Sequence, residues 1–567
     1  MTRMRMMIVT ICTSCLAIAA TPSAQTVKGS LPKDAPPRIL PYRGLTPGLD
    51  THADVLNAMG DPVFESKWYN YKLYYPAVDR PGMFDIVHLH GKQPEARLAE
   101  IDAASIPDGY ETEKAVRAKL GKPEYVLRMA TWSMLDYTER GLRFALSSKG
   151  NTIGVTYFPH LTRRVPVGER ALVDLSRLRE GPQPKPDLLP DLNGLKVGVS
   201  EKVVSAQEGW LAHRFQIHDD LKARTAVFSD GNETVAFVGA DLFGMRWKDV
   251  NVMRDEAKRL GVNHLVLASS HNHAAGDTLG VYGHYPAEFV AFIHSQVIDS
   301  IKVALNDMQE VVELRTASKE LPMDGIRVQG LFRNARNPGV LDPTISIVQA
   351  IGKNDKVITT MVHFACHVES LTKGSREISA DFPGYMCDQI EQDGGGQPIF
   401  LNGALGGMIS GDNRERTHES AKVMGLELAR IVKDLIPTAT SAGKYAFSVD
   451  QRLLQIPMTN PNFQERIESG YRTVYRGRVT TDMMYIKLGE AQFVTLPGEL
   501  LPEVSFEIIE EMQGFPRMLI GLANDQLGYM VPPYDFRVDA YEESVSQGPA
   551  AATQVRDMAI RMLQEKF

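Results

Sequence analysis

The sequence predicts an α/β domain with a central mixed or mostly parallel sheet, preceded by a small α+β repeat module. After about residue 195, short apolar runs alternate with helical segments up to the C-terminus, a pattern typical of α/β folds. Residues 40–165 instead contain a weak internal repeat. The chain has 567 residues, of which 43% are hydrophobic and 23% charged. This ordinary composition excludes a disordered, collagen-like or coiled-coil protein.

The charge balance excludes one class of function. The chain contains 62 Lys and Arg against 69 Asp and Glu, which gives a net charge of −7. A nucleic-acid-binding protein needs a basic face for phosphate contacts, so we expect no nucleic-acid partner.

The first 24 residues have the pattern of a secretory signal peptide. Arg3 and Arg5 precede a mostly apolar stretch at residues 6–20, and small residues follow. This stretch is too short to span a bilayer comfortably, so we expect a periplasmic or secreted protein without a transmembrane anchor. Beyond it, Cys366 and Cys387 are the remaining cysteines. They either form a disulfide or serve as small buried hydrophobic residues, and both interpretations stay open.

Residues 40–165 contain two copies of a short unit. Residues 54–62 are echoed by residues 115–123, with the Val and the Gly-x-Pro both offset by 61 residues. Each copy predicts a short helix that ends at glycine and leads into an aromatic strand. The unit resembles the small outer-membrane-assembly lipoprotein module of the BamE/SmpA type, which implies a packing role or contact with an envelope partner. A Pro-rich stretch at 166–194 predicts a linker to a domain spanning 195–567.

Polar residues follow the C-terminal ends of six predicted strands in this second domain. The strands are predicted at residues 235–240, 265–270, 357–364, 398–401, 493–496 and 518–522. The polar residues after them are Asp241, His271 with His273, His367, Asn402, Glu499, and Asn524 to Tyr529. Ligands of open α/β sheets bind outside the carboxyl ends of the strands, so these ends predict one site.

His271 and His273 give the sharpest local signal for a metal. Residues i and i+2 of an extended chain point to the same side, so both imidazoles can reach one ion. Zinc commonly takes histidine together with a carboxylate and leaves a position open for water. Each residue alone also fits a structural role, such as Glu499 capping the following helix or Tyr529 packing in the core. A mononuclear metal site is favoured when all of these residues are taken together with His367.

Six stretches of the second domain match, in order, the motifs of one known family. They are residues 268–277 with T-H-T-H-S-G-P, 336–338 with N-R-S-P, 362–370 with F-A-x-H-G-T-S, 378–385 with I-S-G-D-N-K-G-Y, 496–499 with V-P-G-E, and 524–529 with N-x-Y-x-x-Y. With these motifs, the domain resembles the catalytic domain of the neutral, non-lysosomal ceramidase family.

The resemblance implies a zinc-dependent hydrolase that cleaves the amide bond of a ceramide-like N-acyl lipid, in sphingolipid metabolism. It implies a Zn²⁺ ion held by His271, His367, Glu499 and Tyr529. It also implies that His273 and Arg336 assist at the substrate carbonyl, where an N–H or a cation stabilises the developing oxyanion. Zinc would polarise this carbonyl and lower the pKa of its bound water towards about 7. Asp381 either fixes a histidine tautomer or caps the following helix.

Two positions depart from the family's motifs. The family's G-D-V-S-P-N loop, whose Ser has a central catalytic role, corresponds here to residues 406–412, with Gly407 replacing Asp and Ser410 displaced by one residue. Ser410 stays a candidate catalytic residue, but we expect zinc-bound water to be the nucleophile. Gln526 stands at the first Tyr of N-x-Y-x-x-Y.

Two alternative functions remain at this stage. One is a metal hydrolase of the same fold that acts on another amide or an ester, and the other is a non-catalytic envelope-binding protein.

The stretch from His218 to Leu221 is expected to line the cleft rather than to take part in the chemistry.

Overall fold

The computed structural model describes residues 41–565, and the predicted signal peptide and most of the predicted linker lie outside the described residues. Within this range the structure leaves out residues 67–70, 79, 82, 90–91, 124, 129–131, 138–139, 148, 159–170, 175–193, 208–209, 212–215, 282–284, 324–326, 329, 338–339, 372–376, 413–414, 443–446, 461–473 and 537–540.

The N-terminal part contributes a nine-stranded sheet in the order β1-β2-β3-β4-β8-β7-β6-β5-β9. The strands are β1 (Phe64–Ser66), β2 (Tyr71–Pro76), β3 (Phe84–Leu89), β4 (Leu98–Ala103), β5 (Tyr125–Arg128), β6 (Trp132–Tyr137), β7 (Leu142–Ser147), β8 (Thr152–Tyr157) and β9 (Ala171–Asp174). Strand β9 falls within the segment predicted to be a linker, and it pairs in parallel with β5.

The two halves of this sheet are built alike. Helices α1 (His52–Met59) and α2 (Glu113–Leu120) begin at residues 52 and 113, a difference of 61, and each precedes four strands. Each helix ends at a glycine, Gly60 or Gly121, whose φ angles of 76° and 81° suit glycine better than other residues. The Tyr75 hydroxyl donates to the Gly60 carbonyl, and the Tyr137 hydroxyl donates to the Gly121 carbonyl. The sequence repeat therefore corresponds to two similar helix-and-meander units.

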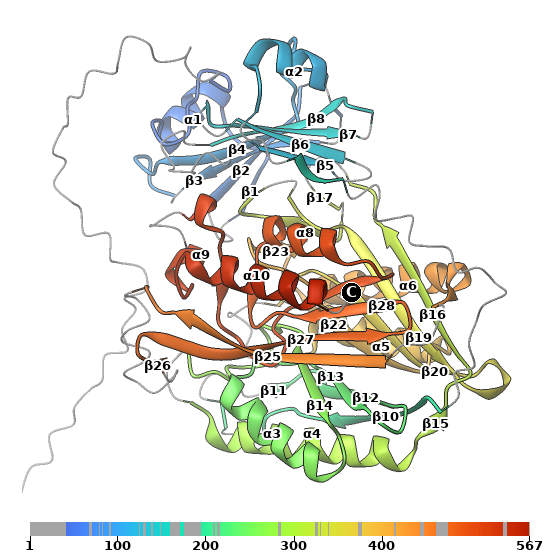
Figure 1. The fold of residues 1–567 in the computed structure, drawn as a ribbon. Helices are drawn as coiled ribbons and strands as arrows, with labels where there is room; N and C mark the ends of the chain where they lie inside the picture. The colour runs from blue at the N-terminus through green and yellow to red at the C-terminus, as the bar shows by residue number, and fades with distance from the viewer. Residues whose placement is uncertain are drawn as a thin grey trace, which may run out of the picture. The chain divides into compact units, whose positions relative to one another are not determined.

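Three five-stranded sheets follow from residue 196 onward, and each is covered by its own helices (Figure 1). The first contains β14 (His264–Ser269), β13 (Thr234–Ala240), β12 (Lys222–Ser229), β10 (Lys196–Val203) and β15 (Gln309–Glu310), with α3 (Trp247–Arg259) and α4 (Ala287–Asn306). The second contains β22 (Gln397–Asn402), β20 (Val357–Phe364), β19 (Thr344–Ile351), β16 (Glu313–Glu320) and β24 (Thr440–Ser441), with α5 (Asp381–Gln392) and α6 (His418–Leu435). The third contains β25 (Phe447–Pro457), β27 (Arg478–Leu488), β28 (Ala491–Thr495), β30 (Arg517–Ile520) and β26 (Val474–Tyr475), with α8 (Pro502–Glu511) and α10 (Ala550–Glu565).

Short pairings and helices complete the described part of the fold. They are β11 (Gln216–Ile217) with β21 (Glu377–Ile378), β29 (Glu499–Leu500) with β31 (Tyr529–Met530), the sheet of β17 (Arg327–Val328), β18 (Phe332–Asn334) and β23 (Ile409–Gly411), the 3₁₀ turns η4 (Lys353–Asp355), η5 (Ile436–Thr438) and η7 (Pro533–Asp535), and α9 (Tyr541–Ser544).

The six strands predicted to lead into the site are all present, as β13, β14, β20, β22, β28 and β30. They form three parallel pairs, one in each large sheet, whereas the other ladders of these sheets are antiparallel. The mixed α/β prediction is confirmed. The expectation of one central sheet, mixed or mostly parallel, is corrected, because the strands form three separate mixed sheets whose ladders are largely antiparallel. Hairpins supply the antiparallel partners: only Gly489 and Glu490 separate β27 from β28, and so short a turn joins antiparallel strands.

The inner faces of the three sheets share one apolar core, because both faces of their central strands are apolar. On β13, Val235 and Phe237 point into this shared core, while Ala236 and Val238 pack on the side of α3 and α4. Gly239 allows a close approach between two sheets, since a Cβ there would lie 2.7 Å from the Phe400 carbonyl oxygen on β22. The sheets thus bring their parallel pairs together.

Two further expectations concern the cysteines and the membrane. Cys366 and Cys387 are both free and buried, so the interpretation as small hydrophobic residues is confirmed over the disulfide.

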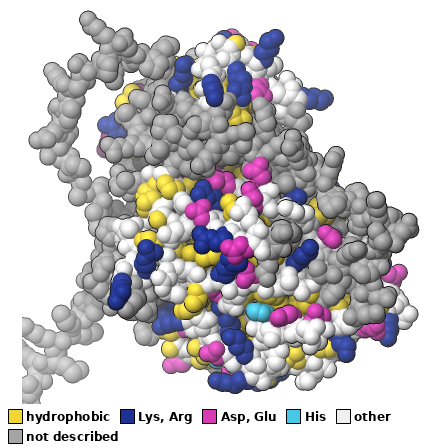
Figure 2. Space-filling model, viewed as in Figure 1, with side chains coloured by type: hydrophobic (Ala, Val, Ile, Leu, Met, Phe, Trp, Pro, Cys, Tyr) yellow, Lys and Arg dark blue, Asp and Glu magenta, His cyan; other side chains and the backbone are white. Residues whose placement is uncertain are grey.

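Among the described helices, none has the length and apolar character needed to cross a bilayer. On the face shown in Figure 2, described Lys and Arg side chains are interspersed with Asp and Glu side chains.

Candidate metal centre

Each parallel strand pair ends level at its carboxyl edge, and this brings the predicted site residues together. Ala240 pairs with Ser269, Phe364 with Asn402, and Thr495 with Ile520. The Asn402 amide nitrogen then joins two of these edges, because it donates to the Ser270 and Cys366 carbonyls at 2.8 Å each. Those two carbonyls belong to the residues directly before His271 and His367.

His271 lies where β14 ends, in an unusual backbone conformation with φ 64°. A non-glycine residue in this region is strained and persists only where its surroundings hold it. Asn272 provides such support, since its backbone N–H donates to the Leu242 carbonyl at 2.9 Å and its side chain donates to the Ser379 carbonyl at 2.7 Å. His273 is held by a backbone bond from its N–H to the Val368 carbonyl.

Glu499 and Tyr529 come from a two-residue parallel pairing between β29 and β31, in which they are direct partners. Partners in such a ladder point to the same side of the sheet. Gly406 packs against this pairing, because a Cβ there would lie 2.6 Å from the Glu499 carbonyl oxygen. Glu499 does not cap the following helix, as α8 has no side-chain cap. Its carboxylate instead faces the histidines.

The nitrogen and oxygen atoms of these side chains converge on one point. His367 Nε2 lies 3.1 Å from Glu499 Oε2 and 3.1 Å from the Tyr529 hydroxyl. His271 Nε2 lies 3.5 Å from Glu499 Oε2 and 3.3 Å from His273 Nε2. Ligands of a tetrahedral zinc ion with bonds of about 2.0–2.1 Å lie about 3.3 Å apart. The spacing therefore fits a zinc ion, and His271, His273 and His367 form a candidate metal-binding group.

Backbone carbonyls fix both histidine tautomers. His271 Nδ1 donates to the Phe243 carbonyl at 2.9 Å, and His367 Nδ1 donates to the Ile409 carbonyl at 3.1 Å. Because a carbonyl oxygen only accepts, each Nδ1 carries a proton, so in its neutral form each ring directs its Nε2 lone pair inward. Asp381 accepts from the Leu371 N–H and from the Phe382 N–H in the first turn of α5, and no described contact joins it to a histidine.

The electrostatics of the cluster favour an ionised carboxylate beside cationic partners. Burial alone would raise the pKa of Glu499, but the charges and hydrogen bonds of His271 and His367 hold it well below its usual value. Burial lowers the pKa of His367, but the hydrogen bond to Glu499 and the charge of that carboxylate outweigh burial, so the pKa is raised. Positive charge at this point, whether proton or metal ion, is therefore stabilised.

Sequence reasoning missed two residues that support the cluster. The Gln526 amide donates to Glu499 Oε1 at 2.9 Å, at a position that had stood out only as a departure from a family motif. The Met408 sulfur lies 2.7 Å from the Tyr529 hydroxyl, and Met408 has φ 55°. No sequence pattern marks a methionine for this position.

Ser410 lies beside the cluster without touching its ligating atoms in any described contact. Its backbone pairs with His367, and its hydroxyl donates to the Met408 carbonyl at 3.3 Å. The structure thus brings together His271, His273, His367, Glu499 and Tyr529, with Ser410 next to them.

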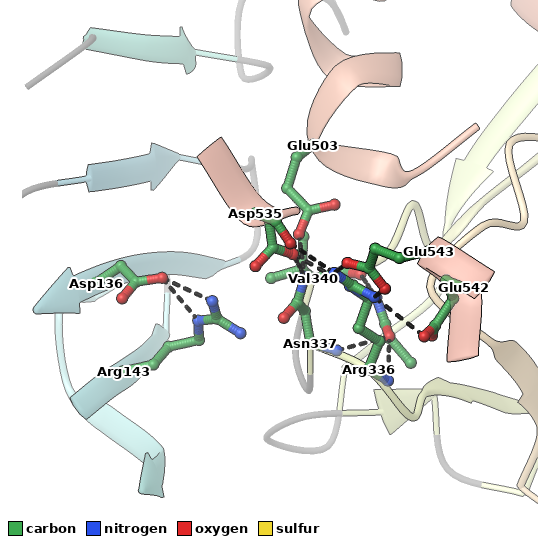
Figure 3. A network of polar contacts seen from close by, with 10 residues as sticks. Asp136, Arg143, Arg336, Asn337, Val340, Glu503, Asp535, Glu542 and Glu543 are labelled. Atoms are coloured by element: carbon green, nitrogen blue, oxygen red, sulfur yellow. Dashed lines mark hydrogen bonds and ion pairs between the residues drawn. The ribbon is translucent and has the colours of Figure 1, made fainter. Parts of the chain in front are cut away.

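Arg336 occupies a different environment, shown in Figure 3. Its buried guanidinium donates to Asp535 at 3.1 Å and to Glu542 and Glu543 at 3.0 Å. Its backbone N–H donates to the Gly407 carbonyl, next to Met408. Arg336 therefore anchors the loop that carries Met408, and its guanidinium is directed toward three carboxylates.

Comparisons with known proteins identify the fold. No family model matches the chain, and no curated protein matches it. Among solved structures, the neutral ceramidase from Pseudomonas aeruginosa matches with TM-score 0.53 and 17% identity, covering 67% of this chain and 75% of that chain. A ceramidase complexed with C2 matches with TM-score 0.54 and 16% identity, covering 67% and 76% of the two chains. The protein therefore has a ceramidase-like fold.

Proposed function

We propose that this protein is an exported, zinc-dependent amidohydrolase that cleaves the amide bond of a ceramide-like N-acyl lipid. One observation carries the proposal: two imidazoles, a carboxylate and a phenol meet at 3.1–3.5 Å within a ceramidase-like fold. Export rests on the signal-peptide pattern of residues 1–24. The N-terminal repeat would contact an envelope partner or pack within the protein.

The donor set suits a zinc ion, and each residue has a distinct role. His271, His367, Glu499 and Tyr529 would hold the ion, which, when bound, polarises the amide carbonyl and lowers the pKa of a coordinated water. Glu499 supplies the negative charge, and the Phe243 and Ile409 carbonyls keep both imidazoles oriented.

His273 is the proposed hydrogen-bond donor to the carbonyl oxygen of the substrate. It is half-buried, whereas His271 and His367 are buried, so it is the histidine of the group best placed to meet a ligand from solvent. We propose a positioning role for Arg336, because three carboxylates already bind its guanidinium. For Ser410 we propose a non-essential role, with water as the nucleophile.

Elemental analysis of the purified mature protein tests the zinc assignment. We expect stoichiometric zinc in the wild type and its loss from the His271→Ala and His367→Ala variants. His273→Ala should keep zinc and lose activity. His294→Ala is a suitable control, since His294 pairs with Glu256 on the protein surface. A wild-type protein without zinc, unaffected by chelators, would instead favour a non-catalytic binding protein.

Release of a fluorescent product from labelled ceramide tests the substrate. Activity on ceramide supports the proposal, whereas activity confined to other amides or to esters would assign a different hydrolase of the same fold. Ser410→Ala separates the two nucleophiles, because substantial residual activity is expected if water attacks. Complete loss of activity with zinc retained would make Ser410 the nucleophile.

A further inference from the structure

A second group of metal-ligating side chains lies apart from the proposed zinc centre. His218, Glu377 and His418 bring their ligand atoms to within 4.8 Å of one another. His418 Nε2 lies 2.8 Å from Glu377 Oε2, and the two imidazole rings stack with centroids 3.6 Å apart. Their side chains are between 25% and 38% exposed, so an ion can reach them from solvent.

Three segments far apart in the sequence place these residues together. Strand β11 pairs in parallel with β21, so that Gln216 is the partner of Glu377, and the His218 N–H then donates to the Ile378 carbonyl at 2.8 Å. His418 is the first residue of α6, whose Thr417 cap accepts from the Ser420 N–H. The backbone of each segment is thus fixed by its own hydrogen bonds.

The stacking of the two rings limits the charge that the histidines can carry. Two protonated imidazoles stacked 3.6 Å apart would repel each other, so at least one ring is neutral and offers a lone pair. The His418 Nε2 atom faces Glu377 Oε2 at 2.8 Å, so a metal ion held by these two residues would bind His418 through this nitrogen.

We propose that His218, Glu377 and His418 form a second site for a divalent transition-metal ion of the Zn²⁺ type. Two imidazoles and one carboxylate are a known zinc ligand set, and solvent exposure leaves room for a water ligand. An ion bound there would join β11, β21 and the start of α6. This site is independent of the proposed catalytic function.

The same segment also reaches the proposed zinc centre. Asp219 accepts from the Ser379 hydroxyl and from the Ala380 N–H at 2.6 Å each, and the Ser379 carbonyl accepts from Asn272. Asn272 lies between His271 and His273. Metal at the second site would therefore stabilise a segment that supports the histidine pair, so we expect added Zn²⁺ to raise the melting temperature through this site.

Zinc titration of the chelator-stripped full-length protein tests the proposal. We expect two zinc ions per chain in the wild type and one in the His218→Ala/His418→Ala variant. His294→Ala provides a closely matched control, because His294 and Glu256 lie 3.0 Å apart with 24% and 39% exposure, against 25% and 37% for His418 and Glu377. This control should still bind two ions.

Further variants separate this site from the proposed catalytic one. His271→Ala/His367→Ala should keep one ion, and Glu377→Gln should weaken its binding. If the catalytic centre binds no zinc, the wild type should bind one ion and His218→Ala/His418→Ala none, which would still support the second site. Equal zinc binding by the wild type and His218→Ala/His418→Ala, with both proteins folded by circular dichroism, would overturn it.

Discussion

Glu499 and Tyr529 are direct partners in the parallel pairing of β29 and β31, although 30 positions separate their numbers 499 and 529. The pairing points a carboxylate and a phenol at the same imidazole, His367, at 3.1 Å each. The two side chains differ in charge, so they should contribute differently to metal binding.

Replacing these two proposed ligands one at a time should distinguish the effect of their charge from the effect of their contact with the ion. Glu499→Gln removes the negative charge that balances the ion, so we expect loss of stoichiometric zinc and of activity. Tyr529→Phe removes a neutral hydroxyl, so zinc should remain, bound more weakly. Zinc content after dialysis against a mild chelator measures both effects. Equal retention of zinc in Glu499→Gln and wild type would exclude Glu499 as a ligand.

Gly406→Ala should displace the β29–β31 pairing. The added Cβ would lie 2.6 Å from the Glu499 carbonyl oxygen and 2.7 Å from the Leu500 carbonyl carbon, and backbone atoms cannot move aside as side chains do. We expect a loss of roughly 1–3 kcal/mol in the free energy of unfolding. Urea denaturation measures the loss, and zinc affinity should fall with it. Wild-type stability would show that the loop adjusts freely.

Asn402→Asp should weaken the proposed metal centre without changing any of its proposed ligands. The amide nitrogen donates to the Ser270 and Cys366 carbonyls, and a carboxylate of the same shape would repel both oxygens. Since such supporting bonds orient the ligands, we expect zinc affinity to fall about 10- to 100-fold. Competition with a chromogenic chelator measures the affinity. An unchanged affinity would mean that the two strand ends hold their spacing without Asn402.

Arg336→Met tests the positioning role proposed for Arg336. Removing the guanidinium leaves Asp535, Glu542 and Glu543 buried without their cation, which typically costs about 3–5 kcal/mol. We therefore expect a large drop in the urea midpoint, together with weaker activity. A direct role at the substrate carbonyl predicts the opposite pattern, in which stability is normal and kcat alone collapses.

Asp381 should make stability depend on pH. Burial, the largest effect, raises its pKa from 3.8 to about 6, although backbone hydrogen bonds from Leu371 and Phe382 oppose this shift. Between pH 3.8 and about pH 6 the folded state binds more protons than the unfolded state. The contribution of Asp381 to the free energy of unfolding therefore falls as pH rises. Relative to Asp381→Asn, the wild type should lose on the order of 2 kcal/mol between about pH 4 and pH 7. Urea denaturation across this range measures the difference, and a pH-independent difference would contradict the prediction.

The six strands could be predicted from sequence because the signal is local. An apolar run bounded by polar residues, such as Val357 to Phe364, forms a strand in almost any α/β setting, and β20 has those same bounds. Which strands pair is a non-local property. The sequence suggested one central sheet, mixed or mostly parallel, where there are three separate mixed sheets.

The residues of the candidate site also divide into those that the sequence marks locally and those whose role depends on the fold. His271, His367, Glu499 and Tyr529 stood out because they follow strand ends and match motifs of a known family. Asn402 also follows a strand end, but its role came only from the fold. Like Gln526, Met408 and the Phe243 carbonyl, it supports the site through contacts across the fold, and a backbone carbonyl carries no sequence signal at all.

The amino-acid sequence by itself determined the positions of these six strands, the internal repeat and the candidate metal-binding residues, since all of these depend on local patterns of side chains. Only the tertiary structure decided that Glu499 faces the histidines rather than capping α8, that Arg336 binds three carboxylates, and that His218 meets His418. Those outcomes depend on which distant segments lie side by side, and the packing of the three sheets sets that arrangement.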